Sequence, residues 1–434
     1  MKPKTSIFWF RRDLRVEDNV GLYHALSSGN KVLPLFIFDT DILENLDTDD
    51  ARVTFIHEEL TRMHRFLSEV GSSLFVRRGK VTEVFKELLN TFDLQEVYVN
   101  RDYEPYATQR DAEVKDFLSL MNVPLLSFKD QVIFETNEIV KQDGSPYKVY
   151  TPYSKKWLSQ LSETFYACFT TSDLLENFYK FTSNLISLEE IGFRPSSVKV
   201  LPFDTSESMV DGYEGTRNFP GVQGTSRLSP HLRFGTVSVR KCVQNALMSS
   251  NTTFLKELIW REFFMQILWH FPKTVLCNFK PKYDGILWRN NQKEYQAWCD
   301  GNTGYPIVDA GMRELNSTGF MHNRVRMITA SFLCKHLLID WRWGEMYFAK
   351  KLLDFDLAQN VGNWQWVAGT GCDAAPYFRI FNPTEQVKKF DKDFTYIKKW
   401  VPEFQELTYV LPMVDHKEAR ERCLKTYKEG LSNN

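Results

Sequence analysis

Hydrophobic and polar residues follow two different periods along the chain. Five short apolar runs occupy residues 6–10, 32–38, 73–76, 96–99 and 124–128. Amphipathic stretches separate these runs, as in residues 52–70, where apolar side chains recur on one helical stripe. Nearly continuous apolar strands that alternate with helices are typical of a parallel sheet covered on both faces. We therefore expect residues 1–130 to form an α/β domain with a doubly wound, Rossmann-like parallel sheet.

The pattern changes after residue 130. Residues 131–205 contain turn signals such as residues 142–146, which predict an interdomain linker with one helix near residues 153–161. From residue 206 the apolar residues recur with helical spacing, and convincing strands are few. Four examples of this spacing are residues 253–271, 307–316, 324–338 and 344–353. We expect residues 206–434 to form an all-α domain.

Composition restricts the class of protein. With 434 residues, 43% hydrophobic and 25% charged, the chain matches soluble globular proteins and not disordered, collagen-like or coiled-coil chains. It holds no run of about 18 apolar residues, so we expect no membrane span. The first apolar stretch is interrupted by Arg11 and Arg12, unlike a signal peptide. Seven cysteines without a CxxC pair indicate a reducing compartment. We expect a cytoplasmic protein.

Charge and aromatic residues are unevenly distributed. The net charge of −1 divides into about −9 for residues 1–220 and +8 for residues 221–434. A basic half indicates an anionic partner such as nucleic acid, although basic solvated faces are common. Nine of the eleven tryptophans lie between Trp260 and Trp400. Several have polar neighbours, so they suit either a stacking surface for flat rings or a hydrophobic core.

Familiar hydrolytic and metal-binding motifs are absent from the sequence. There is no HExxH, Walker A, GxSxG or EF-hand pattern, the histidines do not cluster, and we expect no metal site. No GxGxxG follows the first predicted strand. Residues 224–230, Gly-Thr-Ser-Arg-Leu-Ser-Pro, suit either phosphate binding or an ordinary helix N-cap. Residues 354–360 place two carboxylates before an amide, which suits hydrogen bonds to ring N–H groups or ribose hydroxyls, or a helix N-terminal turn.

Taken together, these stretches resemble the photolyase/cryptochrome family. Residues 8–15 look like its N-terminal signature, residues 224–230 like its flavin phosphate loop, and the likeness is nearly continuous over residues 304–384. The resemblance covers essentially the whole chain. Within the family, the sequence is most similar to class I cyclobutane pyrimidine dimer photolyases. The resemblance implies an α/β antenna-chromophore domain, a linker, and a helical domain that binds FAD and DNA.

The resemblance also implies a reaction and a set of residues. It implies a light-driven carbon–carbon lyase, in which reduced FAD donates an electron to a flipped-out cyclobutane pyrimidine dimer and splits it into monomers. The implied FAD-binding residues are Tyr213, Thr225, Ser226, Arg227, Leu228, Ser229, Arg261, Asp354, Asp356 and Asn360. The implied lesion and DNA contacts are Arg217, Glu257, Trp260, Asn323, Arg324, Met327 and Trp366.

Two of these residues are expected to act directly in catalysis. The amide of Asn360 would face the flavin N5 nitrogen and favour the reduced form without adding charge. Glu257, protonated or polarised in a partly dry pocket, would hydrogen-bond the thymine carbonyls as charge develops on them. Trp364, Trp341 and Trp288, ordered from flavin to surface, match the family's electron relay, although each could also be a core residue.

A second, antenna chromophore remains open. Residues 103–107, Tyr-Glu-Pro-Tyr-Ala, lack the polar Asn-Glu pair of folate-binding relatives. Folate is therefore doubtful, and a deazaflavin, a second flavin or an empty site are the alternatives. The expected partner is UV-damaged DNA, bound by a monomer without contact to a membrane.

Three other functions compete with repair of cyclobutane dimers. A cryptochrome would use the flavin to sense light and signal, but Asn360 is the residue typical of repair enzymes. A (6-4) photolyase would carry paired histidines in its pocket, whereas here His322 stands beside Asn323. A redox flavoprotein without a nucleic-acid role would not need the basic C-terminal half. We therefore favour repair of cyclobutane dimers.

Overall fold

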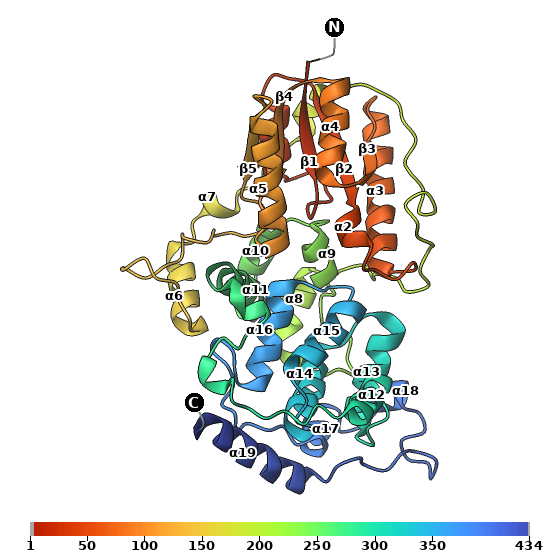
Figure 1. Cartoon of the computed structure of the whole chain (residues 1–434), viewed down its shortest axis with the longest axis vertical. Coiled ribbons are helices and arrows are strands. Elements are labelled where there is room, and N and C mark those ends of the chain that lie inside the picture. The colour runs from red at the N-terminus through yellow and green to blue at the C-terminus, as the bar shows by residue number, and fades with distance from the viewer. Residues whose placement is uncertain (1–3, 433–434) are drawn as a thin grey trace. The chain divides into compact units, whose positions relative to one another are not determined.

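The computed structural model describes residues 4–432 and divides into two compact units. Unit 1 comprises the chain up to Glu135 together with Leu161–Phe203 and Leu228–Asn245. Unit 2 comprises Thr136–Gln160, Asp204–Arg227 and the chain from Ala246 onward. Figure 1 shows the helices and strands of both units, coloured by residue number.

Unit 1 is built on a five-stranded, entirely parallel sheet with the strand order β3-β2-β1-β4-β5. The strands are β1 (Lys4–Phe10), β2 (Val32–Asp39), β3 (Phe75–Gly79), β4 (Asp93–Asn100) and β5 (Leu125–Phe128). Each strand overlaps one apolar run expected from the sequence, and its two ends lie within three residues of the ends of that run. The α/β fold class is confirmed.

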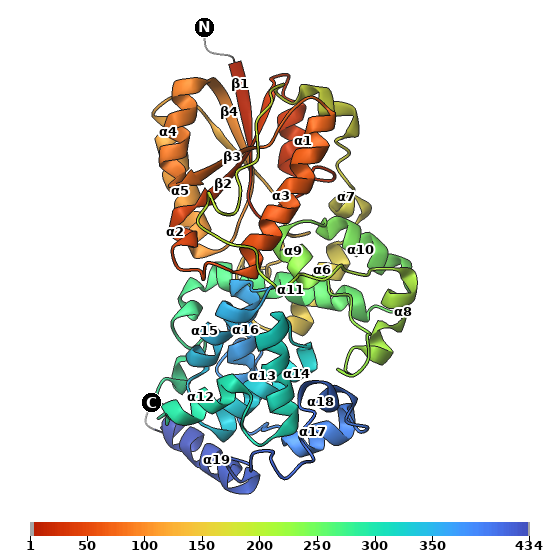
Figure 2. The same ribbon diagram turned by 90° about the vertical axis from the view of Figure 1, so that its right-hand side faces the viewer.

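Side chains that alternate along a strand enter two separate cores. Ile7 and Trp9 of β1 pack in the core that includes residues of helices α4 and α5, whereas Phe8 and Phe10 pack in the core with α1 and α3. Figure 2 shows α4 and α5 on one side of the sheet and α1 and α3 on the other. Because both faces are covered, every position of β1 and β2 except Lys4 is buried. The helical segments of unit 1 are α1 (Val20–Leu26), α2 (Thr40–Leu43), α3 (Ala51–Glu69), α4 (Val81–Thr91), α5 (Pro105–Ser119), α7 (Glu163–Tyr166), η1 (Ser172–Asn177), α9 (Ser229–Phe234) and the part of α10 (Val239–Met248) up to Asn245.

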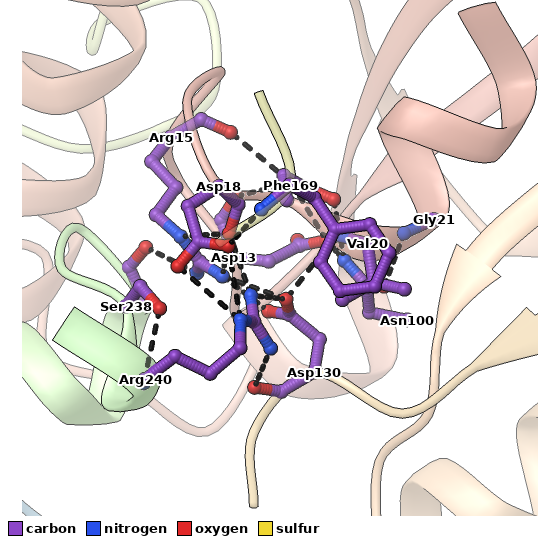
Figure 3. Close-up of polar contacts among 12 residues, drawn as sticks. Asp13, Arg15, Asp18, Val20, Gly21, Asn100, Asp130, Phe169, Ser238 and Arg240 are labelled. Carbon is purple, nitrogen blue, oxygen red and sulfur yellow. Dashed lines mark hydrogen bonds and ion pairs between the residues drawn. The ribbon is translucent and has the colours of Figure 1, made fainter. Parts of the chain in front are cut away.

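A buried ion network lies just beyond the carboxyl end of β1 (Figure 3). Arg15 and Arg240 both bind Asp130, with N–O distances of 2.6 and 2.8 Å. Arg240 also binds Asp18 at 2.9 Å, and the Asn100 amide donates to Asp13 at 2.6 Å. Burial alone raises the pKa of Asp130, but the two arginines hold it below its usual value.

This network explains why unit 1 includes a late segment of the chain. The sequence-based ranges put residues 228–245 in the helical domain and residues 131–205 in a linker. In the structure the first of these segments carries Arg240 into the network. Unit 1 also takes Leu161–Phe203, while Thr136–Gln160 packs in unit 2. The contacts that assign these segments join residues more than a hundred positions apart, which sequence periodicity does not record.

The described part of unit 2 consists of helices joined by loops, with one isolated β-bridge between Val140 and Pro146. Its segments are α6 (Tyr150–Gln160), α8 (Glu207–Thr216), the end of α10, α11 (Thr253–His270), η2 (Pro272–Val275), η3 (Pro281–Tyr283), α12 (Gln292–Asp300), α13 (Pro306–Thr318), α14 (Asn323–Ser331), η4 (Phe332–His336), α15 (Trp341–Lys351), α16 (Leu357–Ala368), α17 (Pro383–Phe390), α18 (Thr395–Trp400) and α19 (His416–Ser432). The all-α class of this half is confirmed. The helix expected over residues 324–338 is α14 followed by one π-helical turn, η4, whose residues are all buried.

Candidate functional site

Half of the expected site residues lie on α16 of unit 2 and on three helices that pack around it. Helices α11, α14 and α15 each contact α16. Glu257, Trp260 and Arg261 lie on α11, and Trp341 lies on α15. Asn323, Arg324 and Met327 lie on α14, and Asn360, Trp364 and Trp366 lie on α16. The tertiary structure therefore gathers residues from three distant stretches of sequence into one helical cluster.

A group of cations and aromatic rings brings together the expected DNA contacts. Arg217, which caps the C-terminus of α8, forms an ion pair with Glu257. A guanidinium N–H of Arg324 donates to the Asn218 side chain, and its guanidinium lies 4.4 Å from the centre of the Phe390 ring. Burial lowers the pKa of Arg324, and the nearby charges of Arg217 and Arg379 lower it further. Like charges placed so close indicate a surface that accepts an anion.

Arg379 extends this group, and the sequence analysis missed it. Its guanidinium lies 5.7 Å from the ring centre of Trp366 and 5.4 Å from that of Phe381. It follows Tyr377 and Phe378 in the chain, an aromatic and basic run that could have drawn attention to it. Trp366 itself is half-buried, so an edge or face of its indole remains accessible.

A second group of residues joins two of the expected FAD contacts. Arg227 lies 3.8 Å over the Phe320 ring, and Arg326 lies 5.9 Å from the centre of the same ring. Arg326 in turn binds both carboxylate oxygens of Asp354, at 3.1 and 2.8 Å. Arg227 has a positive φ of 54°, an uncommon conformation for a residue with a side chain. Backbone strain of this kind gathers at ligand-binding sites.

Buried His322 adds a hydrogen-bond donor to this basic group. Its Nδ1 accepts from the backbone N–H of Arg324 at 3.1 Å, so the ring hydrogen lies on Nε2. Burial lowers the pKa of His322 to about 4, with the charges of Arg326 and Arg227 acting in the same direction. Within residues 4–432, its Nε2 finds no hydrogen-bond partner. A neutral donor beside Arg227 and Arg326 fits a phosphate-bearing cofactor such as FAD.

The amide of Asn360 is oriented by a residue that the sequence analysis did not select. Asn360 is 9% exposed, and its Nδ2 donates to the backbone oxygen of Glu345 at 3.0 Å and to its Oε1 at 2.8 Å. Burial raises the pKa of Glu345. Because both contacts use the amide nitrogen, the carbonyl oxygen of Asn360 is the group left to accept a hydrogen bond from a ligand N–H.

The three tryptophans expected to relay electrons belong to one packed region. Trp341 and Trp364 lie in the same hydrophobic core, and half-buried Trp288 packs against it. Gly344 follows Trp341 by one helical turn, and a Cβ at Gly344 would overlap the Trp364 ring. Trp364 therefore lies against the face of α15 that carries Trp341. The indole N–H of Trp341 donates to Asn278 at 2.9 Å.

The remaining expected residues occupy simpler settings. Tyr213 lies on α8 with its ring edge-on to Phe254, and the Asp356 side chain caps the N-terminus of α16. A guanidinium N–H of Arg324 donates a hydrogen bond to the sulfur of Met327 at 3.6 Å. Thr225 and Ser226 lie in the loop before Arg227 in unit 2, while Leu228 and Ser229 precede or begin α9 and belong to unit 1. The backbone oxygen of Arg261 accepts a hydrogen bond from the side-chain amide of Gln359 at 2.7 Å.

Two features are absent from residues 4–432. No helix in that range is both long enough and apolar enough to cross a bilayer. No group of three or more His, Cys, Asp or Glu residues in that range is placed to hold a metal ion.

Comparison with known proteins identifies the family. A model described as "FAD binding domain of DNA photolyase" matches residues 254–409, and one described as "DNA photolyase" matches residues 6–170. The chain is 37% identical to a deoxyribodipyrimidine photo-lyase of Escherichia coli, covering 98% of each chain. It is also 37% identical to one from Halobacterium salinarum, covering 98% of this chain and 99% of that one. The FAD cofactor expected from the sequence is confirmed.

Solved structures agree with the sequence relatives. A bacterial class III photolyase from Agrobacterium tumefaciens superposes with a TM-score of 0.89 at 34% identity, covering 100% of this chain and 99% of that one. An archaeal photolyase from Sulfolobus tokodaii with two FAD molecules gives 0.82 at 31% identity, covering 98% and 100%. A cryptochrome from Synechocystis gives 0.83 at 25%, covering 98% and 99%. The resemblance first noticed in short motifs extends over both units, and the chain belongs to the DNA photolyase family.

Proposed function

We propose that this protein is a light-driven lyase that splits cyclobutane pyrimidine dimers in UV-damaged DNA. The observation that carries the proposal is the cluster of Arg217, Glu257, Arg324 and Trp366 within the helical unit. Three of these four residues also lie within the stretch that matches the FAD-binding domain of DNA photolyase. Enzymes that act on bases need such a combination of phosphate-binding cations and stacking rings around a pocket.

The cations of the cluster would hold the DNA backbone. Arg324 and Arg217 would contact phosphates on either side of the lesion, and exposed Arg379 would add a third positive charge. Contacts to phosphate fix the position of the DNA and make its binding weaken with salt. Trp260 and Trp366 would then stack on bases that have left the DNA helix. A damaged pyrimidine pair costs less free energy to unstack than undamaged bases, so it would be bound preferentially.

Glu257 and Asn360 would act nearest to the chemistry. When bound and reduced, FAD supplies the electron that opens the cyclobutane ring. Asn360, oriented by Glu345, would accept a hydrogen bond at the cofactor and add no charge. Glu257 in its protonated form would donate its O–H to a pyrimidine carbonyl, and its ion pair with Arg217 must open for that. Trp364, Trp341 and Trp288 would carry electrons inward when the cofactor is oxidised.

The remaining parts of the proposal concern cofactors and context. Tyr213, Thr225, Ser226, Arg227, Arg261, Asp354 and Asp356, with Leu228 and Ser229, would bind FAD. A second chromophore would serve as antenna, as the presence of two FAD molecules implies for the Sulfolobus tokodaii relative. We propose that the protein acts as a monomer in the cytoplasm, where it reaches chromosomal DNA.

The test compares two lesions under light. Purified, reduced protein is mixed with an oligonucleotide that holds either a cyclobutane thymine dimer or a (6-4) product, and the recovery of thymine absorbance is followed under blue or near-UV light and in the dark. We expect light-dependent recovery from the cyclobutane dimer alone. Recovery from the (6-4) product alone would reassign the substrate. Bound flavin with neither lesion repaired would instead favour a light sensor of the cryptochrome type.

A further inference from the structure

Tyr150 stacks face to face on Trp260, the tryptophan proposed to contact the lesion. The two ring centres are 3.7 Å apart, and the ring planes differ by only 4°. Tyr150 is the first residue of α6, whereas Trp260 lies on α11, and both belong to unit 2. A parallel stack this close places the phenol ring directly over one face of the indole.

Contacts of its backbone, its hydroxyl and its ring hold Tyr150 in place. Its hydroxyl donates to the backbone oxygen of Lys256 at 2.9 Å, and its backbone N–H donates to Asp373 at 3.1 Å. Burial raises the pKa of the phenol, and the charge of Glu257 raises it further, so the hydroxyl keeps the proton it donates. The Phe263 ring stands edge-on to both Tyr150 and Trp260, with ring centres 5.9 and 5.6 Å away.

The helix that carries Tyr150 is itself pinned beside Trp260. The indole N–H of Trp157 donates to the Glu262 carboxylate at 2.6 Å, and the Tyr153 hydroxyl donates to the same oxygen at 3.3 Å. Glu262 lies two residues after Trp260 on α11 and is 2% exposed. Buried hydrogen bonds to a carboxylate are strong, so α6 and this part of α11 hold a fixed relative position.

This geometry has one consequence for any base that stacks on Trp260. An indole has two faces, and Tyr150 lies over one of them. Phe264 is also stacked on Trp260, with its ring centre 5.6 Å away and its plane tilted by 29°. Trp260 is half-buried, so a base must use the part of the indole that these two rings leave exposed. We propose that Tyr150 is a positioning residue that holds the plane of Trp260 ready for a flipped-out pyrimidine pair. This inference rests on the proposed function. Tyr150 acts through Trp260 and is not itself a catalytic residue.

The physical benefit is preorganisation. An isolated tryptophan side chain turns about two single bonds, and that freedom is lost when a base stacks on it. Because Tyr150 already restricts the Trp260 ring, that ring loses less conformational entropy when a base stacks on it. The smaller entropy loss strengthens recognition of the lesion. The energy of one aromatic pair corresponds to about a twofold to tenfold change in affinity.

The experiment measures discrimination between damaged and undamaged DNA in the dark. Affinity is determined for one oligonucleotide with a cyclobutane thymine dimer and for the same sequence without it, using FAD-loaded protein. Tyr150→Phe keeps the ring and is expected to discriminate as the unaltered protein does. Tyr150→Leu removes the ring, and we expect the affinity ratio to fall about twofold to tenfold. Flavin absorbance and affinity for undamaged DNA should not change.

A double substitution separates positioning from a general structural role. Trp260→Leu should lower the ratio by itself, and adding Tyr150→Leu to it should have no further effect, because Tyr150 acts through Trp260. If both single variants lower the ratio and their effects add in the double variant, the inference is overturned. If Tyr150→Leu does not retain FAD, then Tyr150→His, with a smaller flat ring, is used and should give an intermediate ratio.

Other results would also overturn the inference. An unchanged ratio in Tyr150→Leu, or in Tyr150→His where that variant is used, would show that the stack does not aid recognition. A higher ratio would show that Tyr150 blocks the face that the lesion needs. Equal weakening for both oligonucleotides would place Tyr150 in general DNA binding. A lack of discrimination by the unaltered protein would instead overturn the proposed function itself, and the inference with it.

Discussion

Arg217 and Glu257 form an ion pair with each other, although their expected roles are different. One was expected to contact DNA phosphate and the other the lesion. Each side chain is about one-third exposed, at 32% and 37%, so incoming DNA can reach both. In the absence of DNA each neutralises the other, and binding of a phosphate to Arg217 would free Glu257 from the ion pair.

Replacing Glu257 by alanine should separate repair from binding. We expect Glu257→Ala to lower the repair yield about tenfold to hundredfold, because a hydrogen bond to a charged group is lost where charge develops on the substrate. FAD absorbance should be retained. Repair per absorbed photon at saturating DNA is the measurement. Loss of flavin on purification would contradict the role assigned to Glu257.

Replacing Trp364 by phenylalanine should block reduction of the cofactor but spare repair. We expect Trp364→Phe to stop photoreduction of oxidised FAD, since phenylalanine is far harder to oxidise, while chemically reduced enzyme still repairs the dimer. Trp298→Phe is the matched control, because Trp298 is also fully buried and lies edge-on to Trp364, 6.2 Å between ring centres, but is outside the relay. Photoreduction that persists in Trp364→Phe would show that electrons enter by another route.

Removing the charge of Arg324 should change the salt dependence of DNA binding. We expect Arg324→Gln to weaken binding to damaged DNA and to reduce the slope of log affinity against log salt by about 1, because one phosphate contact is lost. Lys425→Gln serves as control, since that side chain is 78% exposed on α19, away from the proposed contacts. An unchanged slope in Arg324→Gln would exclude a phosphate contact.

The stability of the protein should fall as the solution becomes acidic, in part because of His336. This residue is fully buried, and its Nε2 lies 2.8 Å from Nδ1 of His416. Burial lowers its pKa to about 3, and His416 and Arg422 add to the effect. Because the folded state holds the neutral form, the stabilisation is present above about pH 6.5 and is lost as the pH falls toward 3.

Thermal unfolding across this pH range tests the contribution of His336. One such group changes the free energy of unfolding by up to about 1.4 kcal/mol per pH unit between pH 6.5 and 4. His336→Gln should therefore give a shallower fall of the unfolding midpoint. Equal slopes in the variant and in the unaltered protein would refute the assignment.

The close approach of Trp364 to α15 depends on Gly344. A Cβ there would overlap the Trp364 ring and lie 2.6 Å from Leu333, so Gly344→Ala should destabilise the protein by about 1–3 kcal/mol and displace the indole. Gly212→Ala on α8 is the matched control, because its Cβ would meet nothing within 4 Å and should stabilise the helix slightly. The unfolding midpoint and the flavin spectrum report both effects. An unchanged midpoint in Gly344→Ala would contradict this packing.

Local patterns in the sequence were sufficient to predict most helices and strands and to recognise the family. The five strands of unit 1 and helices α3, α11, α13 and α15 follow from the spacing of apolar residues, because that spacing records which face each element buries. The basic excess after residue 220 indicated an anionic partner, and the tryptophans from Trp260 onward suited either a stacking surface or a core, because composition records both. The flavin was implied only by the family resemblance.

Contacts between distant residues were decided only by the tertiary structure. Asn360 and Glu345, Arg227 and Arg326, and Tyr150 and Trp260 lie 15, 99 and 110 positions apart, and no period along the chain relates them. Arg240 likewise enters the network at β1 from a segment that its helical pattern alone would place elsewhere. The sequence determined which faces are apolar and which side chains are present. Packing determined which of those side chains meet, because burial rewards any arrangement that covers apolar surface, whereas a hydrogen bond or a stack needs two specific partners at one distance.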